Sequence, residues 1–128
     1  MGAFKEQVRK SDALLLAINE HDYSNSAALQ NAVDGGARPF LENVRKGKPT
    51  DLLSFSVGRI GGPRTRCLLR AKFVWPNGFP INQPEVGVPF APKGIDETGK
   101  LIDDGSRKPI ADPQTGLARC TGQLQGRV

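Results

Sequence analysis

The residues of this 128-residue chain best suited to a chemical task are cations at alternate positions in its central part. They are Arg64, Arg66, Arg70 and Lys72, preceded by Arg45, Lys46 and Lys48. A guanidinium group matches the oxygens of a phosphate, so a strand with these side chains on one face could hold a phosphodiester backbone. The seven residues are therefore predicted to contact nucleic acid. The alternative is that they only keep an exposed strand soluble.

The charge of the chain is concentrated in the same region. Residues 38–72 contain nine basic and two acidic side chains, whereas residues 73–128 contain six of each. Residues 1–37 carry a small acidic excess. A local excess of this kind attracts polyanions, which supports contact with an RNA or DNA backbone rather than recognition of bases.

Residue types that serve catalysis or bind metals are scarce. There is one histidine and there are two cysteines in the whole sequence. His21 lies in the short segment 21–24, where sequence neighbours cannot form a triad, so a surface histidine is favoured. Cys67 and Cys120 lack neighbours for a metal set and are expected to be two buried thiols. The sequence thus predicts no catalytic residue, no metal site, no cofactor and no small-molecule substrate, and therefore a protein that is not an enzyme.

Helical spacing dominates the first third of the chain. One apolar series recurs at spacings of four, seven and three: Phe4, Val8, Leu15 and Ile18. This series predicts an amphipathic helix over residues 3–20. Residues 24–26 are good N-caps for a second helix from Ala27, which Gly35 and Gly36 would end. Pro39 begins a predicted short third helix that continues to Val44.

From Asp51 onward the apolar residues alternate with polar or small ones. Odd positions from Leu53 to Val57, and again from Cys67 to Trp75, are mostly apolar. This period of two predicts a β-hairpin whose turn contains Gly61 and Gly62, with the odd face on the helices and the even, cationic face outside. Trp75 and Phe79 flank the next turn. They are expected in the core, and stacking on bases is the alternative.

The last part of the chain is rich in prolines and turn signals. Four prolines between Pro80 and Pro92 disfavour helix and central strand, and three turn signals follow between Asp96 and Gly116. The predicted fold is therefore α+β: two or three N-terminal helices packed on an antiparallel hairpin, then an extended or short-stranded arm. Residues 1–93 form the body, and residues 94–128 form a turn-rich arm that is not an independent domain.

These features together predict a structural protein. The tail 121–128 has little to bury within its own domain, so neighbouring copies or another structural protein are expected to hold it. With a basic surface and no catalytic set, the favoured function is non-enzymatic assembly, as in a small viral or phage coat or capsid-associated subunit. The alternative is a small protein that binds single-stranded nucleic acid as a monomer or dimer.

No membrane partner is expected. The longest apolar run, Ala13–Ile18, has six residues, against roughly 20 for a membrane span. The first residues lack the apolar stretch of a signal peptide. The expected location is the virion for a viral protein and the cytoplasm otherwise.

Overall fold

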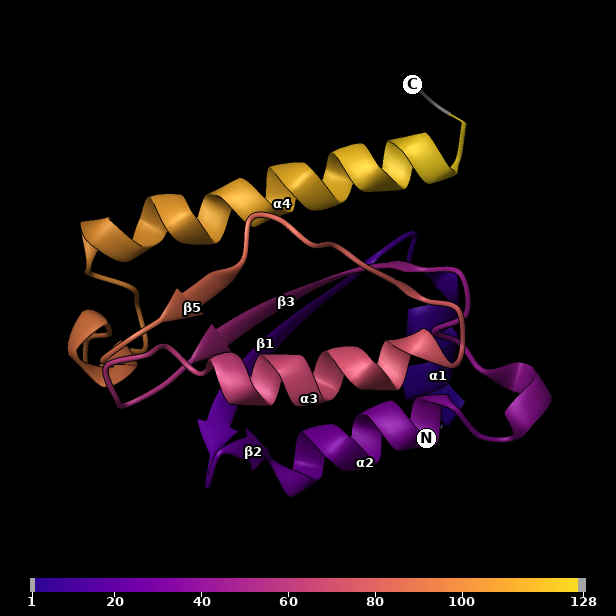
Figure 1. The fold of residues 1–128 in the computed structure, drawn as a ribbon, viewed down its shortest axis with the longest axis horizontal. Coiled ribbons are helices and arrows are strands. Elements are labelled where there is room, and N and C mark those ends of the chain that lie inside the picture. The colour runs from indigo at the N-terminus through magenta and orange to yellow at the C-terminus, as the bar shows by residue number, and fades with distance from the viewer. Residues whose placement is uncertain (1, 127–128) are drawn as a thin grey trace.

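Residues 2–126 are described by a computed structural model, in which a mostly parallel sheet lies between two layers of helices (Figure 1). The helices are α1 (Gly2–Lys10), α2 (Ala27–Gly36), α3 (Pro63–Val74) and α4 (Asp104–Leu124), with 3-10 turns η1 (Phe40–Glu42) and η2 (Ala91–Gly94). The strands are β1 (Leu14–His21), β2 (Ser24–Asn25), β3 (Pro49–Phe55), β4 (Phe79–Pro80) and β5 (Val86–Val88). Helices and strands alternate along most of the chain, which is the pattern of an α/β protein.

Strand β3 is the centre of the sheet. It runs parallel to β1, from Leu14 opposite Thr50 to Asn19 opposite Phe55. Its other edge pairs in parallel with β4 near its start and with β5 near its end. The short strand β2 is antiparallel to the last two residues of β1. The carboxyl ends of β1, β3 and β5 therefore lie at one edge of the sheet, at the arrowheads on the left of Figure 1.

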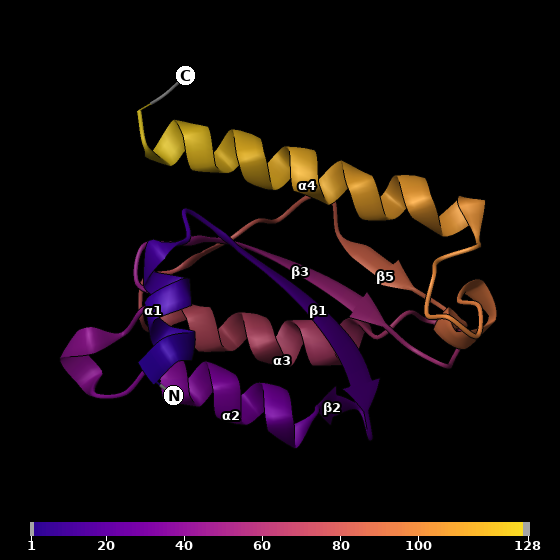
Figure 2. The ribbon, with the colours of Figure 1, turned by 180° about the vertical axis from the view of Figure 1, so that it is seen from behind.

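Each face of the sheet has its own apolar cluster. Beneath α2 and α3, Ile18 and Leu52 pack with Leu69 and Phe73, all buried. On the opposite face Leu53 packs with Val86 and Val88, and the half-buried Ile110 of α4 covers them. Figures 1 and 2 show α4 alone on this side and the other helices away from it. The two-sided burial of β3 explains its nearly continuous apolar and small-polar sequence.

The predicted antiparallel hairpin is wrong, because residues 63–74 form helix α3. Thr65, Leu69 and Phe73 all occupy odd positions, but they are also four residues apart and all fully buried. Such a series fits a helix as well as a strand, and Pro63 directly after two glycines is a helix-start signal. The fold is thus α/β with a mostly parallel sheet, rather than helices on a hairpin.

The predicted helix over residues 3–20 is also wrong. The helix ends at Lys10, and Leu14–His21 is strand β1. The run of three leucines in β1 is typical of a strand in a parallel sheet. Leu15 and Ile18 of this strand matched the helical spacing by chance.

The second helix is confirmed, with Ser26 as its N-cap accepting a hydrogen bond from the Leu29 amide at 3.3 Å. Gly35 and Gly36 lie inside this helix, however, and do not end it in a left-handed conformation. The predicted third helix is only the single turn η1.

The predicted extended arm is wrong as well, because most of it is the 21-residue helix α4. Ile110 and Leu117 lie seven residues apart and face the rest of the protein: Ile110 covers the second apolar cluster, and Leu117 lies near Ala13. This apolar stripe outweighs the loss of a helical hydrogen bond at Pro109. Arg127 and Val128, the end of the expected contact tail, lie outside the described residues. The domain boundary near residue 93 stays a prediction.

Two further findings concern membrane-spanning helices and the two cysteines. The helices of residues 2–126 include none long and apolar enough to cross a membrane. Both cysteines are free, but Cys67 is exposed and Cys120 is half-buried, so the expectation of two buried thiols is wrong.

Candidate functional site at the carboxyl edge of the sheet

The first part of the candidate site is the turn after β1. Asp22 and Tyr23 have φ angles of 48° and 62°, so the chain reverses tightly between β1 and β2. Glu20 points to the α3 side with only 7% of its side chain exposed, whereas His21 and Tyr23 are exposed. The turn therefore presents an imidazole and a phenol to solvent at the carboxyl edge of the sheet.

The second part is the loop of residues 56–62, which joins β3 to α3. Ser54 Oγ donates a hydrogen bond to the Gly61 carbonyl at 2.6 Å, which fixes the loop to its own strand. A Cβ on Gly61 would lie 2.6 Å from the carbonyl carbon of Gly87, and its φ of +66° is left-handed. Only glycine satisfies both conditions. We call residues 56–62 the glycine loop.

The first turn of α3 joins these two segments. The Glu20 carboxylate accepts a hydrogen bond from the Thr65 amide at 3.4 Å and lies 3.5 Å from Arg64 Nη1. The Arg64 guanidinium also lies 4.0 Å from the centre of the Tyr23 ring. Thr65 Oγ1 donates to Asn25 Oδ1 at 2.6 Å, and both side chains are buried. The turn after β1 and the glycine loop are therefore held in fixed relative positions.

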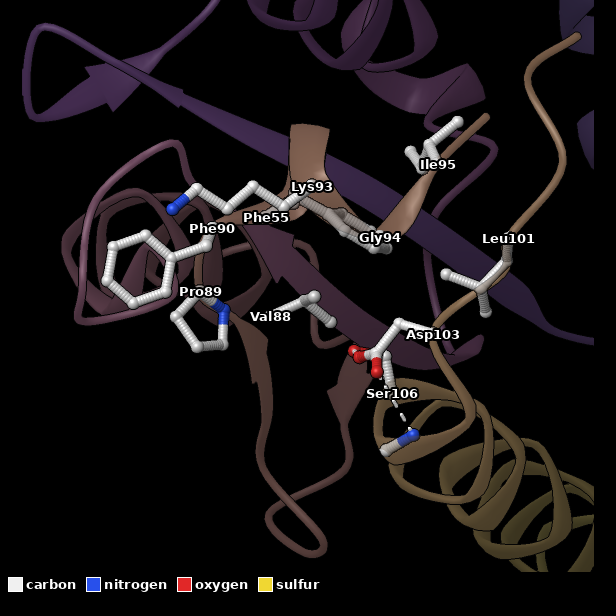
Figure 3. A pocket seen from close by; sticks show the side chains of 12 residues that line it. Phe55, Val88, Pro89, Phe90, Lys93, Gly94, Ile95, Leu101, Asp103 and Ser106 are labelled. Carbon is white, nitrogen blue, oxygen red and sulfur yellow. Dashed lines mark hydrogen bonds between the residues drawn. The ribbon is translucent and has the colours of Figure 1, made fainter. Parts of the chain in front are cut away.

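A cavity of about 440 Å³ adjoins the glycine loop (Figure 3). Most of its lining is apolar, including Val88 and Leu101, which Figure 3 shows on different segments around it. The loop and the cavity wall are hydrogen-bonded, since the Phe90 amide donates to the Gly58 carbonyl at 3.1 Å. The volume is within the range of small-molecule sites, and the lining is mostly apolar.

At the start of α4, beside this cavity, a carboxylate of the chain itself accepts hydrogen bonds from the helix. Asp103 accepts hydrogen bonds from the Ser106 hydroxyl and the Gly105 amide. These bonds, the Ser106 bond first, hold the pKa of Asp103 below its usual value. A charged Asp103 at the helix N-terminus disfavours an anion there.

The structure does not bring the predicted cationic residues together on one surface. Four of them lie on α3, and each contacts a different partner. Arg64 pairs with Glu20, Arg66 with Glu85 at 2.7 Å, and Lys72 with Asp34 at 3.0 Å. Arg70 Nη1 donates to the Ile81 carbonyl at 3.0 Å. Helical rather than strand geometry separates them, because alternate residues of a helix face different directions.

The other three predicted nucleic-acid contacts lie at the amino end of the sheet, opposite its carboxyl edge. Arg45 is 7% exposed, and its guanidinium donates to the Lys72 carbonyl at 3.1 Å. Burial lowers the pKa of Arg45 from its usual value. Lys46 is exposed, and the Lys48 ammonium donates to the Ser11 carbonyl. Whether any of the seven residues touches nucleic acid stays untested.

Sequence reasoning missed Glu20 and the glycine loop as site residues. Glu20 lies near the end of β1, and the glycine loop follows β3. The carboxyl ends of such parallel strands are where α/β proteins bind ligands. The position of these residues at strand ends could be recognised only once β1 and α3 were identified. Residues 49–74 then form the order strand, glycine-containing loop, helix. Under the hairpin interpretation the same glycines needed only to form a turn.

An open, mostly parallel sheet with helices on both faces and loops gathered at its carboxyl edge defines a flavodoxin-like α/β protein. The solved structure of FerB, a flavoenzyme NAD(P)H:(acceptor) oxidoreductase from Paracoccus denitrificans, has this fold with a TM-score of 0.73. It is 23% identical in sequence, and the match covers 96% of this chain and 66% of that chain.

The sequence family follows from a second comparison. The family model for NADPH-dependent FMN reductase matches residues 1–93, and the chain belongs to this family. An NAD(P)H-dependent FMN reductase of Pseudomonas aeruginosa is 38% identical over 123 residues, 96% of this chain and 66% of that protein. A quinone reductase of Pseudomonas putida is 37% identical over 100 residues, 78% of this chain and 54% of that protein. The chain thus spans between about half and two thirds of the length of these relatives.

Family membership corrects the predicted function. The viral or phage coat subunit, its assembly through a C-terminal arm and its place in a virion are all overturned by membership in a family of reductases. So are the expectations of a protein that is not an enzyme and has no small-molecule substrate. The single-strand nucleic-acid-binding alternative gains no support from these comparisons.

Proposed function

We propose that this protein uses FMN to transfer reducing equivalents from NAD(P)H to a quinone or a flavin. Its family and the names of its relatives, which include FMN reductases and quinone reductases, support this reaction class. The structural observation that carries the proposal is the pair of fixed loops at the carboxyl edge of the sheet, the position at which α/β folds bind nucleotide cofactors.

The glycine loop suits a flat ring on steric grounds. A Cβ on Gly58 would meet only Ser56 Oγ, at 3.5 Å, so the space beside this residue is open. Without a side chain at Gly58, a planar ring can approach the backbone closely. The hydrogen bond of 3.0 Å from the Gly58 amide to Ser56 Oγ keeps this part of the loop in place.

The exposed side chains at this edge include the cation Arg59, which can approach the phosphate of FMN, and the carboxylate Asp22. His21 is exposed there as well and can approach an anion. The Glu20 carboxylate, which would repel a phosphate, is paired with Arg64 and accepts a hydrogen bond from the Thr65 amide. The residues present therefore fit the cofactor along one wall of its site.

Residues 2–126 form only this one wall of the proposed site. Among residues 2–126, β1 pairs with β3 over Leu14–Asn19 and has no strand on its other side along this stretch. Across the sheet, the order of these parallel strands is β1, β3, β5, so their spatial order follows their order in the chain without a reversal. Flavodoxin-like folds hold their cofactor where the strand order reverses, so the second wall would lie beyond the free edge of β1.

In this proposal the two loops would hold FMN, which would supply the redox chemistry that links NAD(P)H to the acceptor. The protein binds and orients the FMN. Arg64 holds the Tyr23 turn against α3, and the Ser54 hydroxyl holds the glycine loop on β3. Both segments would be positioned before the cofactor arrives, which reduces the free-energy cost of binding.

The proposal is tested by titrating the protein with FMN and by following NAD(P)H oxidation with a benzoquinone acceptor. Gly58→Asp places a carboxylate where the space is open and should weaken FMN binding by about tenfold or more without unfolding the chain. Gly2→Asp is the matched control, since nothing lies within 4 Å of a Cβ there, and it should bind FMN as the unchanged protein does. Absence of FMN binding and of NAD(P)H-dependent quinone reduction in the unchanged protein would overturn the proposal.

A further inference from the structure

Three large apolar side chains are exposed together at the amino end of the sheet. Leu41 is 94% exposed, Trp75 65% and Phe40 56%. The Phe40 and Trp75 ring centroids are 4.6 Å apart, and a hollow of about 220 Å³ lies beside them and Leu41. We call these three residues the apolar tip. Adjacent exposed apolar residues of this size mark interaction sites more often than single ones do.

The apolar tip lies on a projection of the molecule. Phe40 and Leu41 belong to the turn η1, which protrudes at the right of Figure 1, and Trp75 directly follows the end of α3. Helices α2 and α3 both end on this side, since they run antiparallel to the strands they connect. The tip is therefore at the opposite end of the sheet from the glycine loop.

Basic residues predominate in the segments next to the apolar tip, and Arg38 and Lys46 are exposed there. Helix α1 packs on the segment 37–48, where Lys5 donates to the Arg38 carbonyl at 2.6 Å and pairs with Glu42 at 3.4 Å. Residues 2–10 and 37–48 together contain seven basic and two acidic side chains, and the rest of the chain contains eleven of each. These two segments thus carry five more positive than negative charges, which equals the net charge of the chain. Lys46, which is exposed, lines the hollow itself.

We propose that the apolar tip docks on an anionic lipid surface. Exposed aromatic and aliphatic side chains enter the headgroup and upper acyl region, while neighbouring lysines and arginines attract anionic headgroups. Tryptophan is especially suited to this boundary, because its ring is apolar and its N–H can remain hydrated. Docking in this way leaves the carboxyl edge of the sheet facing away from the membrane. The proposal does not depend on the redox activity.

The same features fit a nucleic acid less well. Leu41, the most exposed of the three, is aliphatic and cannot stack on a base. The Phe40 and Trp75 rings are tilted by 55° to each other, so they do not form a parallel platform for successive stacked bases. An apolar tip with basic residues beside it is instead complementary to a bilayer interface in both of its parts.

Trp75 is the only tryptophan of the chain and reports on the proposal directly. Its emission is recorded during titration with vesicles of phosphatidylcholine alone and of phosphatidylcholine with phosphatidylserine. We expect a blue shift and saturable binding with the anionic vesicles, quenching by acyl-brominated lipid, and at least about tenfold weaker binding to the neutral vesicles.

Variants at exposed positions separate the two components of binding. Leu41→Ser should weaken binding to anionic vesicles by about tenfold, whereas Ile102→Ser, at a 53% exposed residue elsewhere, should not. Lys46→Gln should weaken it by about fivefold, and the matched change Lys108→Gln, on α4, should have less effect.

Three outcomes would overturn the proposal. One is no change in Trp75 emission with any vesicle. Another is a blue shift that depends on protein concentration in the absence of lipid, which would assign the apolar tip to contact between copies of the chain. The third is a response to an oligonucleotide with none to vesicles, which would assign it to nucleic acid.

Discussion

The Thr65 hydroxyl donates a hydrogen bond of 2.6 Å to the side-chain oxygen of Asn25, across 40 residues of sequence. Thr65 is fully buried in the first turn of α3, and Asn25, in β2, is 7% exposed. Together with the contacts of Glu20 and Tyr23 with the first turn of α3, this bond connects the β1–β2 segment to the residues that follow the glycine loop. A buried pair of polar side chains therefore helps to hold the two parts of the proposed cofactor wall together.

Removal of the Thr65 hydroxyl should destabilise the protein. Thr65→Val keeps the shape of the side chain but leaves the Asn25 oxygen buried without this donor, which we expect to cost about 1–3 kcal/mol. Urea unfolding followed by circular dichroism measures the loss. Thr121→Val removes a hydroxyl that only supplements a helical carbonyl, that of Leu117, and should cost less than about 1 kcal/mol. Equal losses in the two variants would show that the Thr65 contact has no special importance.

A methyl group on Gly61 should be more harmful than one on another left-handed glycine. Gly99→Ala, at φ +84° with nothing within 4 Å, should cost only the conformational penalty of about 1–2 kcal/mol. Gly61→Ala adds a close contact of its Cβ with the Gly87 carbonyl carbon, 2.6 Å away, and should cost about 3 kcal/mol or more. Thermal or urea unfolding of both variants gives the difference, and similar stabilities would refute the tight packing of the glycine loop against β5.

The stability of the protein should depend on pH through Asp51. This carboxyl is 2% exposed, and its Oδ2 has no hydrogen-bond partner among residues 2–126. Burial raises its pKa above the usual 3.8, although the Leu52 amide and the Arg66 charge oppose that shift. The folded chain then holds a proton that the unfolded chain has lost. The Asp51 contribution to stability is therefore present below pH 3.8 and is lost as the pH rises through the raised pKa.

Asp51→Asn isolates this contribution, because it keeps the size of the side chain and removes its titration. The free energy of unfolding of the variant relative to that of the unchanged protein should increase between about pH 3 and pH 7. Exposed Asp96 and Asp103, whose pKa values are lowered by hydrogen bonds, titrate in both proteins and do not affect the comparison. Parallel pH profiles would show that Asp51 is not the group responsible.

The sequence could predict those elements whose signals are local. Helix α2 has a capping serine at Ser26, and β3 has apolar residues at alternate positions such as Leu53 and Phe55. Both elements could therefore be predicted from short stretches of sequence. Helix α3 was not, since the series Thr65, Leu69 and Phe73 satisfies a period of two and a spacing of four at once. Only the partners on β1 and β3 decide between them, and these partners are distant in sequence.

The candidate site was beyond local reasoning for the same physical reason. Glu20 has no neighbours in sequence that suggest a role, and it acquires one only because the parallel pairing of β1 with β3 brings it to the start of α3. The cations of α3 carry a strong local signal, yet each has a structural partner in the fold. A charge pattern alone does not distinguish a binding residue from one that joins two elements.

The most direct test of the proposed cofactor wall is amide hydrogen exchange, measured by mass spectrometry with and without FMN. Bound FMN should slow exchange in two segments, Glu20–Asn25 and Val57–Gly62, and leave the segment 37–48 at the other end of the sheet unchanged. FMN binding that leaves exchange in both carboxyl-edge segments unaltered, or that protects residues 37–48 instead, would contradict the assignment.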